Sequence, residues 1–212
     1  MSDAAGAWTL GAVLYDQFEM LDVYGPLEMF AWVGPELRIV SVARTAGPVA
    51  PAHGPKTLAD HGFGDCPPLD LLLVPGGLGT IAALEDASLL AFLQERAASA
   101  RLTMSVCTGS ALLAKAGVLD GLRATSNKQF FDLSVEQRPD VDWVTEARWV
   151  DAGRVVTSSG VSAGMDMALA VIDRLFGKDR AERIETLTEY TRQRDPSVDP
   201  FVKHLNEAIP GR

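Results

Sequence analysis

The stretch "RLTMSVCTGSALLAKAG" (101–117) changes periodicity at its centre, at Cys107. Residues 101–106 form an apolar run of strand length, and residues 109–117 have the apolar spacing of a helix that Gly117 would end. A buried strand followed directly by a helix is the unit from which parallel α/β sheets are built. The stretch therefore predicts an α/β fold and places Cys107 where a strand turns into a helix.

The same alternation extends on both sides of this unit. Further strands are predicted at 9–15, 37–43 and 69–77, and helices at 22–33, 86–100, 162–177 and 179–194. We expect a hairpin over 141–160 around "DAGR", and loop with short strands over the Gly- and Pro-rich residues 44–68. The pattern predicts one domain over 1–212, with a mostly parallel sheet covered on both faces and a tail from Asp195 that wraps the surface or a partner.

Composition narrows the classes of partner. The chain has 212 residues, 47% of them hydrophobic and 22% charged, which is enough apolar material for a sizeable core. Its formal net charge of -9 argues against nucleic acid or an anionic membrane as the main partner. No apolar run approaches the roughly 20 residues that span a bilayer, and the N-terminus does not have the pattern of a signal peptide. The two cysteines suggest neither a disulfide framework nor a zinc site, so we expect a cytoplasmic protein with reduced thiols and no metal.

Cys107 is the first candidate for chemistry. The carboxyl end of a parallel strand is where α/β folds bind ligands. The N-terminus of the following helix favours a thiolate and is expected to lower the pKa of the thiol. Gly109 lets the backbone turn sharply, as around a nucleophile elbow. The alternative is a packed structural cysteine, because free cysteines are among the most buried residues. The residues alone leave both interpretations open.

The glycines of "PGGLGT" (75–80) follow the next candidate strand end. They would expose backbone N–H groups, as an oxyanion hole requires, or they form a tight turn without function. Gly77, Gly79 and Ala82 also fit the dinucleotide-binding pattern G-x-G-x-x-A. Pro75 and the lack of a suitably spaced acidic residue argue against that interpretation.

Two carboxylates and three histidines complete the candidates. Asp22 either caps the helix at 22–33 or acts as a general acid of raised pKa beside Cys107, and Glu28 is the second carboxylate candidate. A Cys–His dyad is disfavoured because Thr108 follows the cysteine. The histidines, which lie in the loop region and the tail, are His53, His61 and His204. The small residues of "TSSGVSAGMDMAL" (157–169) either line a pocket or pack a strand end against a helix.

Four stretches taken together resemble the ThiJ/PfpI superfamily: "LDVYGPLEMF", "DCPPLDLLLVPGGLGT", "SVCTGSALLAKAGVLDGLRATSNK" and "TSSGVSAGMDMALAVI". The resemblance implies a flavodoxin-like three-layer sandwich related to class I glutamine amidotransferases. The "LD-x-x-GP" and "SVCTGS" pieces look most like the isocyanide hydratase branch, and the amidase domains of some AraC-type regulators are similar. No helix-turn-helix pattern follows, so a DNA-binding regulator is not expected.

The resemblance also implies roles for particular residues. Cys107 would be the nucleophile, Thr108 would help bind substrate, and Asp22 would contact the sulfur. Donors of the oxyanion type would come from the backbone of Gly76, Gly77 and Leu78, and Gly160 and Val161 would pack near the site. The chain departs from relatives in two places. Protease-like members have His where Thr108 stands, and many hydratase-like members have "ATTHW" where this chain has "ATSNK" (124–128), so that Asn127 replaces a histidine.

The expected function is that of a cysteine hydro-lyase without cofactor, which hydrates isocyanides to N-substituted formamides. Its partner would be a small electrophilic substrate. A homodimer is expected, to which Met29 and Trp32 of the first helix could contribute if they are not core residues. Two alternatives stay open: a glyoxalase or deglycase that acts on reactive carbonyls, and a non-enzymatic sensor that uses oxidation of Cys107 as a switch.

Overall fold

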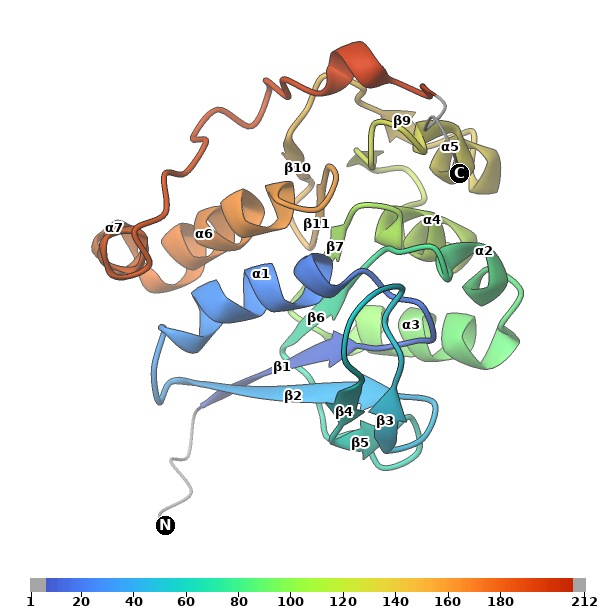
Figure 1. Cartoon of the computed structure of the whole chain (residues 1–212), viewed down its shortest axis with the longest axis horizontal. Coiled ribbons are helices and arrows are strands. Elements are labelled where there is room, and N and C mark those ends of the chain that lie inside the picture. The colour runs from blue at the N-terminus through green and yellow to red at the C-terminus, as the bar shows by residue number, and fades with distance from the viewer. Residues whose placement is uncertain (1–6, 208–212) are drawn as a thin grey trace.

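The computed structural model describes residues 7–207 and has a twisted central sheet between two layers of helices (Figure 1). The seven strands lie in the order β10-β11-β7-β6-β1-β2-β5, and all neighbours are parallel except β10 and β11. The expected mostly parallel α/β sandwich is therefore confirmed. The strands are β1 (Trp8–Val13), β2 (Leu37–Ala43), β5 (His61–Gly62), β6 (Leu71–Val74), β7 (Leu102–Val106), β10 (Trp149–Asp151) and β11 (Val155–Ser158).

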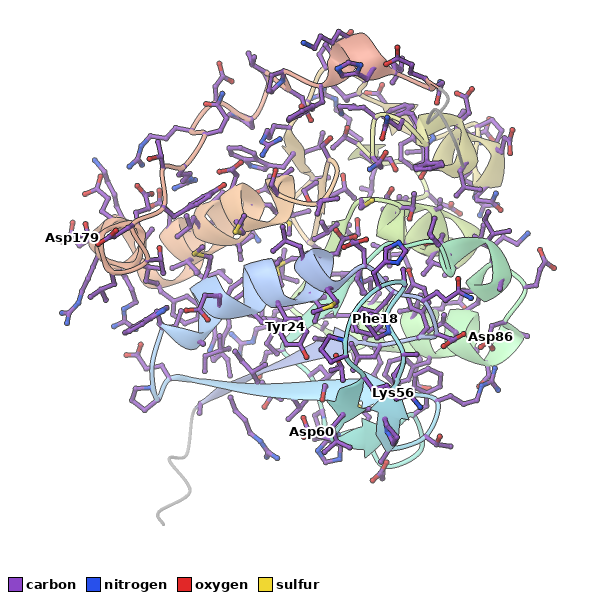
Figure 2. The ribbon with its side chains drawn as sticks, in the orientation of Figure 1. Phe18, Tyr24, Lys56, Asp60, Asp86 and Asp179 are labelled. Carbon is purple, nitrogen blue, oxygen red and sulfur yellow. The ribbon has the colours of Figure 1, made fainter. Side chains whose placement is uncertain are left out.

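Each face of the sheet has its own core. One face packs against α1 (Met20–Ala31), α6 (Ala163–Phe176) and α7 (Lys178–Leu187). The other packs against α3 (Ala87–Ser99) and α4 (Gly109–Lys115), with α2 (Thr80–Ala83) and α5 (Phe131–Gln137) against α4. All four residues of β6 are buried because the strand is covered on both sides, which explains its unbroken apolar sequence. Asp86 caps α3, and its side chain accepts hydrogen bonds from the N–H groups of Ser88 and Leu89 (Figure 2).

The strand order brings several strand ends to one edge. β7 lies between β6 and β11, with Val74 opposite Ser105 and Val106 opposite Ser158. From β1 the chain first adds β2 on one side and then returns to add β6 and β7 on the other. Such a reversal opens a crevice at the carboxyl ends of the strands, where α/β proteins bind ligands. The segments that follow β1, β6, β7 and β11 meet there.

Some predicted elements differ from the structure. The hairpin expected over 141–160 is wrong in its first half: β9 (Asp142–Trp143) pairs in parallel with β8 (Arg123–Ala124), and only β10 and β11 form the hairpin. Helix α7 ends at Leu187 and not at 194, because Glu189 adopts a left-handed φ of 50°. The short strands predicted within 44–68 include β3 (Gly47–Val49) and β4 (Thr57–Ala59). Helices α2 and α5 and the short 3-10 helix η1 (Val202–His204) were not predicted from the sequence.

The segment after α7 wraps over its own chain. It runs from α7 past α6 to α5 (Figure 1), where Asn206 Oδ1 accepts a hydrogen bond from Asp132 N–H. A buried group of charges fastens it. Arg148 pairs with Asp166 at 2.8 Å and with Asp199 of the segment at 3.7 Å, and Lys128 lies 3.9 Å from Asp199. As far as residue 207, the predicted wrapping tail therefore lies on the chain's own surface; its last five residues lie outside the described part of the chain.

The two residues of α1 proposed for a dimer contact differ in exposure. Met29 is a core residue, with 3% of its surface exposed, and so cannot contribute. The exposed fraction of the residue surface is 48% for Trp32, 44% for Tyr24 and 40% for Leu21. Tyr24 lies on the side of α1 near the β3–β4 hairpin, and its hydroxyl bonds Thr57 Oγ1 at 2.8 Å (Figure 2). Homodimerisation stays a prediction. Among residues 7–207, no helix has the length and hydropathy required to cross a bilayer.

The buried charge group leads to a prediction on stability. Arg148→Met should lower the free energy of unfolding by about 3–5 kcal/mol, because it leaves two buried carboxylates without their guanidinium. Arg174→Met is the matched control, since Arg174 pairs with Asp151 at the surface and should cost at most about 1 kcal/mol. Urea denaturation of both variants measures the two losses. Equal losses would contradict the assignment of the charge group as the fastener of the C-terminal segment.

Candidate active site

Cys107 stands on a strained elbow between β7 and α4. Its φ is +59°, a left-handed conformation that is uncommon for residues other than glycine and costs about 1–3 kcal/mol. Its N–H is shared between the carbonyl oxygens of Ser158 and Ser159, at 3.2 and 3.1 Å. Gly109 makes the turn possible, since a Cβ there would lie 2.3 Å from Val74 O. The strain at a strand end facing a crevice is typical of a functional site.

A cavity of about 160 Å³ opens in front of the cysteine. Five of the predicted residues line it together: Cys107, Thr108, Gly77, Leu78 and Val161. Gly160 lines a neighbouring cavity of about 430 Å³ that shares Asn127, Gln129 and Val161 with the first. The remaining wall of the Cys107 cavity is partly polar and partly apolar, and consists of Glu19, His53, Ile81, Phe130 and Leu133.

Asp22 lies fully buried in the first turn of α1. It does not cap that helix, whose N-cap position is Glu19; instead its Oδ2 accepts a hydrogen bond from Gly76 N–H at 2.8 Å. Burial raises the pKa of the Asp22 carboxyl to about 8, against the lowering effects of the Gly76 N–H and of the nearby Cys107 thiol. Oδ1 is buried without a partner of hydrogen-bond geometry among the described residues. A proton on the carboxyl therefore suits its surroundings at neutral pH.

The Cys107 sulfur is surrounded by hydrogen-bond donors. Asn127 Nδ2 lies 3.1 Å from Sγ, and the N–H groups of Thr108 and Val161 also lower the pKa of the thiol. Burial and the Asp22 carboxylate act in the opposite direction and are stronger, so the pKa of the thiol is raised. The expected lowering of that pKa by the helix N-terminus was therefore wrong for the resting site. Thiol and carboxyl form a coupled pair that holds its protons at neutral pH.

The Thr108 hydroxyl belongs to a chain of hydrogen bonds in which each hydroxyl can donate in only one direction. Tyr15 Oη lies 2.9 Å from Pro75 O, which can only accept, so the Tyr15 hydroxyl donates there. Thr80 must then donate to Tyr15 at 3.0 Å, and Thr108 to Thr80 at 2.8 Å. Gly77 N–H donates to Thr108 Oγ1 at 3.2 Å. The Thr108 hydroxyl proton is thus committed to Thr80, and a bound molecule could receive it only if the chain reversed.

The glycines after β6 serve the close packing of the site. A Cβ at Gly76 would lie 2.5 Å from both the nitrogen and Oγ1 of Thr108, and one at Gly79 would lie 1.9 Å from Asp16 O. The N–H groups of Gly76 and Gly77 are taken by Asp22 and Thr108. Among the described residues the Leu78 N–H has no hydrogen-bond partner, so it is the predicted donor of this loop that is open to a ligand.

The other candidate residues lie apart from Cys107. Glu28 is exposed on α1 and accepts a hydrogen bond from Trp32 Nε1 at 3.0 Å. His61 pairs with Asp65, and His204 with Glu207. Within residues 7–207, no cluster of three or more His, Cys, Asp or Glu side chains is arranged to hold a metal ion.

Two titratable residues of the cavity were not assigned to it from the sequence: Glu19 was not a candidate, and His53 was named only as one of the loop histidines. His53 lies at the cavity because residues 50–52 run beside the loop after β1, where Ala52 N–H donates to Phe18 O and Gln17 N–H donates to Ala50 O. No local pattern announces this pairing. The sequence did single out Asn127, because it replaces a histidine in the motif of the relatives. That replacement does not tell where the Asn127 side chain points.

Comparison with known proteins identifies the family of this chain. Residues 12–174 match the model of the DJ-1/PfpI family, and the chain belongs to that family. It is 36% identical over 185 residues to isonitrile hydratase of Pseudomonas putida, which covers 87% of this chain and 79% of the hydratase. It is also 31% identical to the HTH-type transcriptional regulator GbdR of Pseudomonas aeruginosa, and spans only about half (52%) of that protein.

Solved structures give the same result. The crystal structure of a ThiJ/PfpI family protein from Pseudomonas syringae superposes with a TM-score of 0.81 at 33% identity, covering 91% of this chain and 83% of the other. Drosophila melanogaster DJ-1beta shares the fold, with a TM-score of 0.75 at 20% identity over 87% of this chain and 99% of that protein. The predicted superfamily is therefore confirmed.

The raised pKa of Asp22 predicts a dependence of stability on pH. The unfolded carboxyl titrates near 3.8 and the folded one near 8, so the native state binds an extra proton between these values. The contribution of Asp22 to the free energy of unfolding therefore falls as pH rises from about 4 to about 8. Asp22→Asn cannot titrate, so the stability of wild type relative to this variant should decline from pH 5 to pH 8. Denaturation at both pH values measures the change, and a constant difference would mean that Asp22 is ionised throughout.

Proposed function

We propose that this protein is a cysteine-dependent isocyanide hydratase. The observation that carries the proposal is a fully buried carboxyl of raised pKa, Asp22, held beside Cys107, a nucleophile candidate that lines a small cavity. Proton transfer and covalent attack at one carbon atom require such a pair of groups. The identity with an isonitrile hydratase supports the choice of substrate class. The expected small-molecule partner belongs to this proposal.

In the first step Cys107 Sγ attacks the terminal carbon of R–N≡C. Asp22 donates its proton to that carbon, and the proton of the thiol restores the carboxylic acid. A C–S and a C–H bond form, and the product is a thioimidate, R–N=CH–S–Cys107. The raised pKa of Asp22 suits this role, since a general acid works best when its pKa lies near the operating pH.

In the second step water adds to the thioimidate carbon. The Asp22 carboxylic acid first gives its proton to the substrate nitrogen, and the carboxylate so formed takes a proton from the water as the water oxygen bonds to carbon. The C–S bond then breaks, the new hydroxyl group gives its proton to the sulfur, and R–NH–CHO leaves. The open N–H of Leu78 is suited to bind the attacking water or the new hydroxyl, whereas Gly76 and Gly77 hold Asp22 and Thr108 in place.

Steady-state hydration by three variants tests the proposal. Cys107→Ser should lower kcat at least about 10³-fold, since a serine hydroxyl is a far weaker nucleophile than a thiol. Asp22→Asn, which keeps the shape but cannot transfer a proton, should lower kcat about 10²–10⁴-fold. Cys66→Ser is the matched control, because Cys66 lies away from the cavity, and it should retain wild-type rates.

Normal hydration by Cys107→Ser would sink the mechanism. The same preparations separate the two alternative functions. Lactate formation from methylglyoxal that depends on Cys107, without isocyanide turnover, would indicate a glyoxalase. Stable oxidation of Cys107 with no turnover of either substrate would indicate a sensor.

A further inference from the structure

Asn127 lies between β8 and α5 and makes a direct contact with the reacting sulfur. Its Nδ2 donates a hydrogen bond to Cys107 Sγ at 3.1 Å. We propose that the Asn127 side-chain amide is a catalytic residue: a fixed, uncharged donor that stabilises negative charge on Cys107 sulfur as the sulfur attacks. The proposal deepens the function argued above and rests on it for the substrate, but the contact with the sulfur can be tested separately.

The direction of the amide is fixed by its other end. Asn127 Oδ1 accepts a hydrogen bond from the N–H of Phe130 at 3.1 Å. A flipped amide would place two donors against each other at Phe130 and a carbonyl oxygen against the sulfur. The hydrogen-bond pattern therefore assigns the NH₂ group to the Cys107 side.

Gly160 provides the room for this contact. A Cβ at Gly160 would lie 2.5 Å from Asn127 Nδ2, far inside contact distance. The backbone of Gly160 is not in the left-handed region, so its conformation alone does not require glycine. The atom that leaves no room for a side chain at Gly160 is the Asn127 amide nitrogen. Glycine at 160 and asparagine at 127 therefore depend on each other, and we call them a matched pair.

The segment that carries Asn127 is anchored on its C-terminal side. Lys128 is buried, and its ammonium donates to Ala147 O at 2.7 Å and to Thr125 Oγ1 at 2.9 Å. The carbonyl of Lys128 accepts the N–H of Asn206, in the C-terminal segment, at 2.8 Å. The amide is thus presented by a backbone held from two sides, as pre-organised stabilisation of charge requires.

The chemical identity of the donor has a consequence for pH dependence. Burial disfavours the thiolate, and hydrogen bonds to the charged form offset part of that penalty. An amide does not titrate in the working range, so its contribution is present at every pH. A histidine in this position would add a positive charge only below about pH 6.5.

Alkylation of Cys107 by iodoacetamide tests the sulfur contact without isocyanides. It is measured from about pH 6 to 10 in a Cys66→Ser background, which leaves one thiol, since the chain has two cysteines. Asn127→Ala should slow alkylation about three- to tenfold at each pH on the rising limb. One lost hydrogen bond raises the thiol pKa by about one unit, and the greater nucleophilicity of the more basic thiolate offsets part of the loss. A profile that superimposes on that of the parent would overturn the proposal.

Gly160→Ala provides a second test on the same pair. It keeps Asn127 but displaces its amide, so it should slow alkylation as Asn127→Ala does. The double variant Asn127→Ala, Gly160→Ala should react no more slowly than Asn127→Ala alone, because the clash is gone. Additive losses would contradict the matched pair. Asn127→Asp keeps the side-chain volume, replaces the donor by a charged acceptor, and should react more slowly than Asn127→Ala.

Asn127→His distinguishes a donor from a merely structural residue. It should restore much of the alkylation rate and change the pH profile near pH 6.5 relative to that of the parent, whose cavity already contains His53. In hydration assays Asn127→Ala should lower kcat with little change in KM, because the donor acts on charge that grows during attack. If the parent alkylates as expected but no isocyanide is hydrated, the proposed function fails while the role of Asn127 at the sulfur stands. Unchanged alkylation in Asn127→Ala would reject that role even if hydration is found.

Discussion

The close approach between Gly76 and the Cys107–Thr108 elbow is the constraint on which the rest of the site depends. No side chain fits there, since a Cβ on Gly76 would overlap the nitrogen and hydroxyl of Thr108 at 2.5 Å. Because of this approach, two consecutive N–H groups after β6 donate hydrogen bonds to the site: Gly76 N–H to the Asp22 carboxyl and Gly77 N–H to the Thr108 hydroxyl. It joins α1, β6 and α4 at the crevice, so the carboxyl and the thiol are held together by backbone and not by long flexible side chains.

The electrostatics of the pair follow from that packing. Burial raises the pKa of both the carboxyl and the thiol, and each negative charge would further disfavour the other. The donors around Sγ, including Asn127, offset this penalty only in part. In the resting site both the carboxyl and the thiol are therefore protonated and uncharged. That state suits addition of a thiol and a proton across one carbon better than it suits a permanently ionised nucleophile.

Periodicity and turn residues predicted most of the fold. The buried strands β6 and β7 could be recognised because a strand covered on both faces reads as an apolar run, and Gly117 and Gly177 ended helices as glycines with positive φ do. Two-residue strands such as β8 and β9 have no periodicity to detect. Helix α7 was predicted too long because the residue whose left-handed backbone ends it, Glu189, is neither Gly nor Pro and so gives no stop signal in the sequence. In the site, Cys107 could be placed from its strand end. The contact between Asn127 and the sulfur could not, because it depends on tertiary packing at Gly160.

Mass spectrometry of the intact protein during turnover tests the central claim most directly. After rapid mixing with an isocyanide and acid quench, we expect a transient mass increase equal to one isocyanide molecule, located by proteolysis on the peptide that contains Cys107. In D₂O the formyl carbon of the product should carry deuterium, since the proton on that carbon comes from an exchangeable acid. Formamide production without a Cys107 adduct at any time point, or an adduct confined to Cys66, would contradict the account.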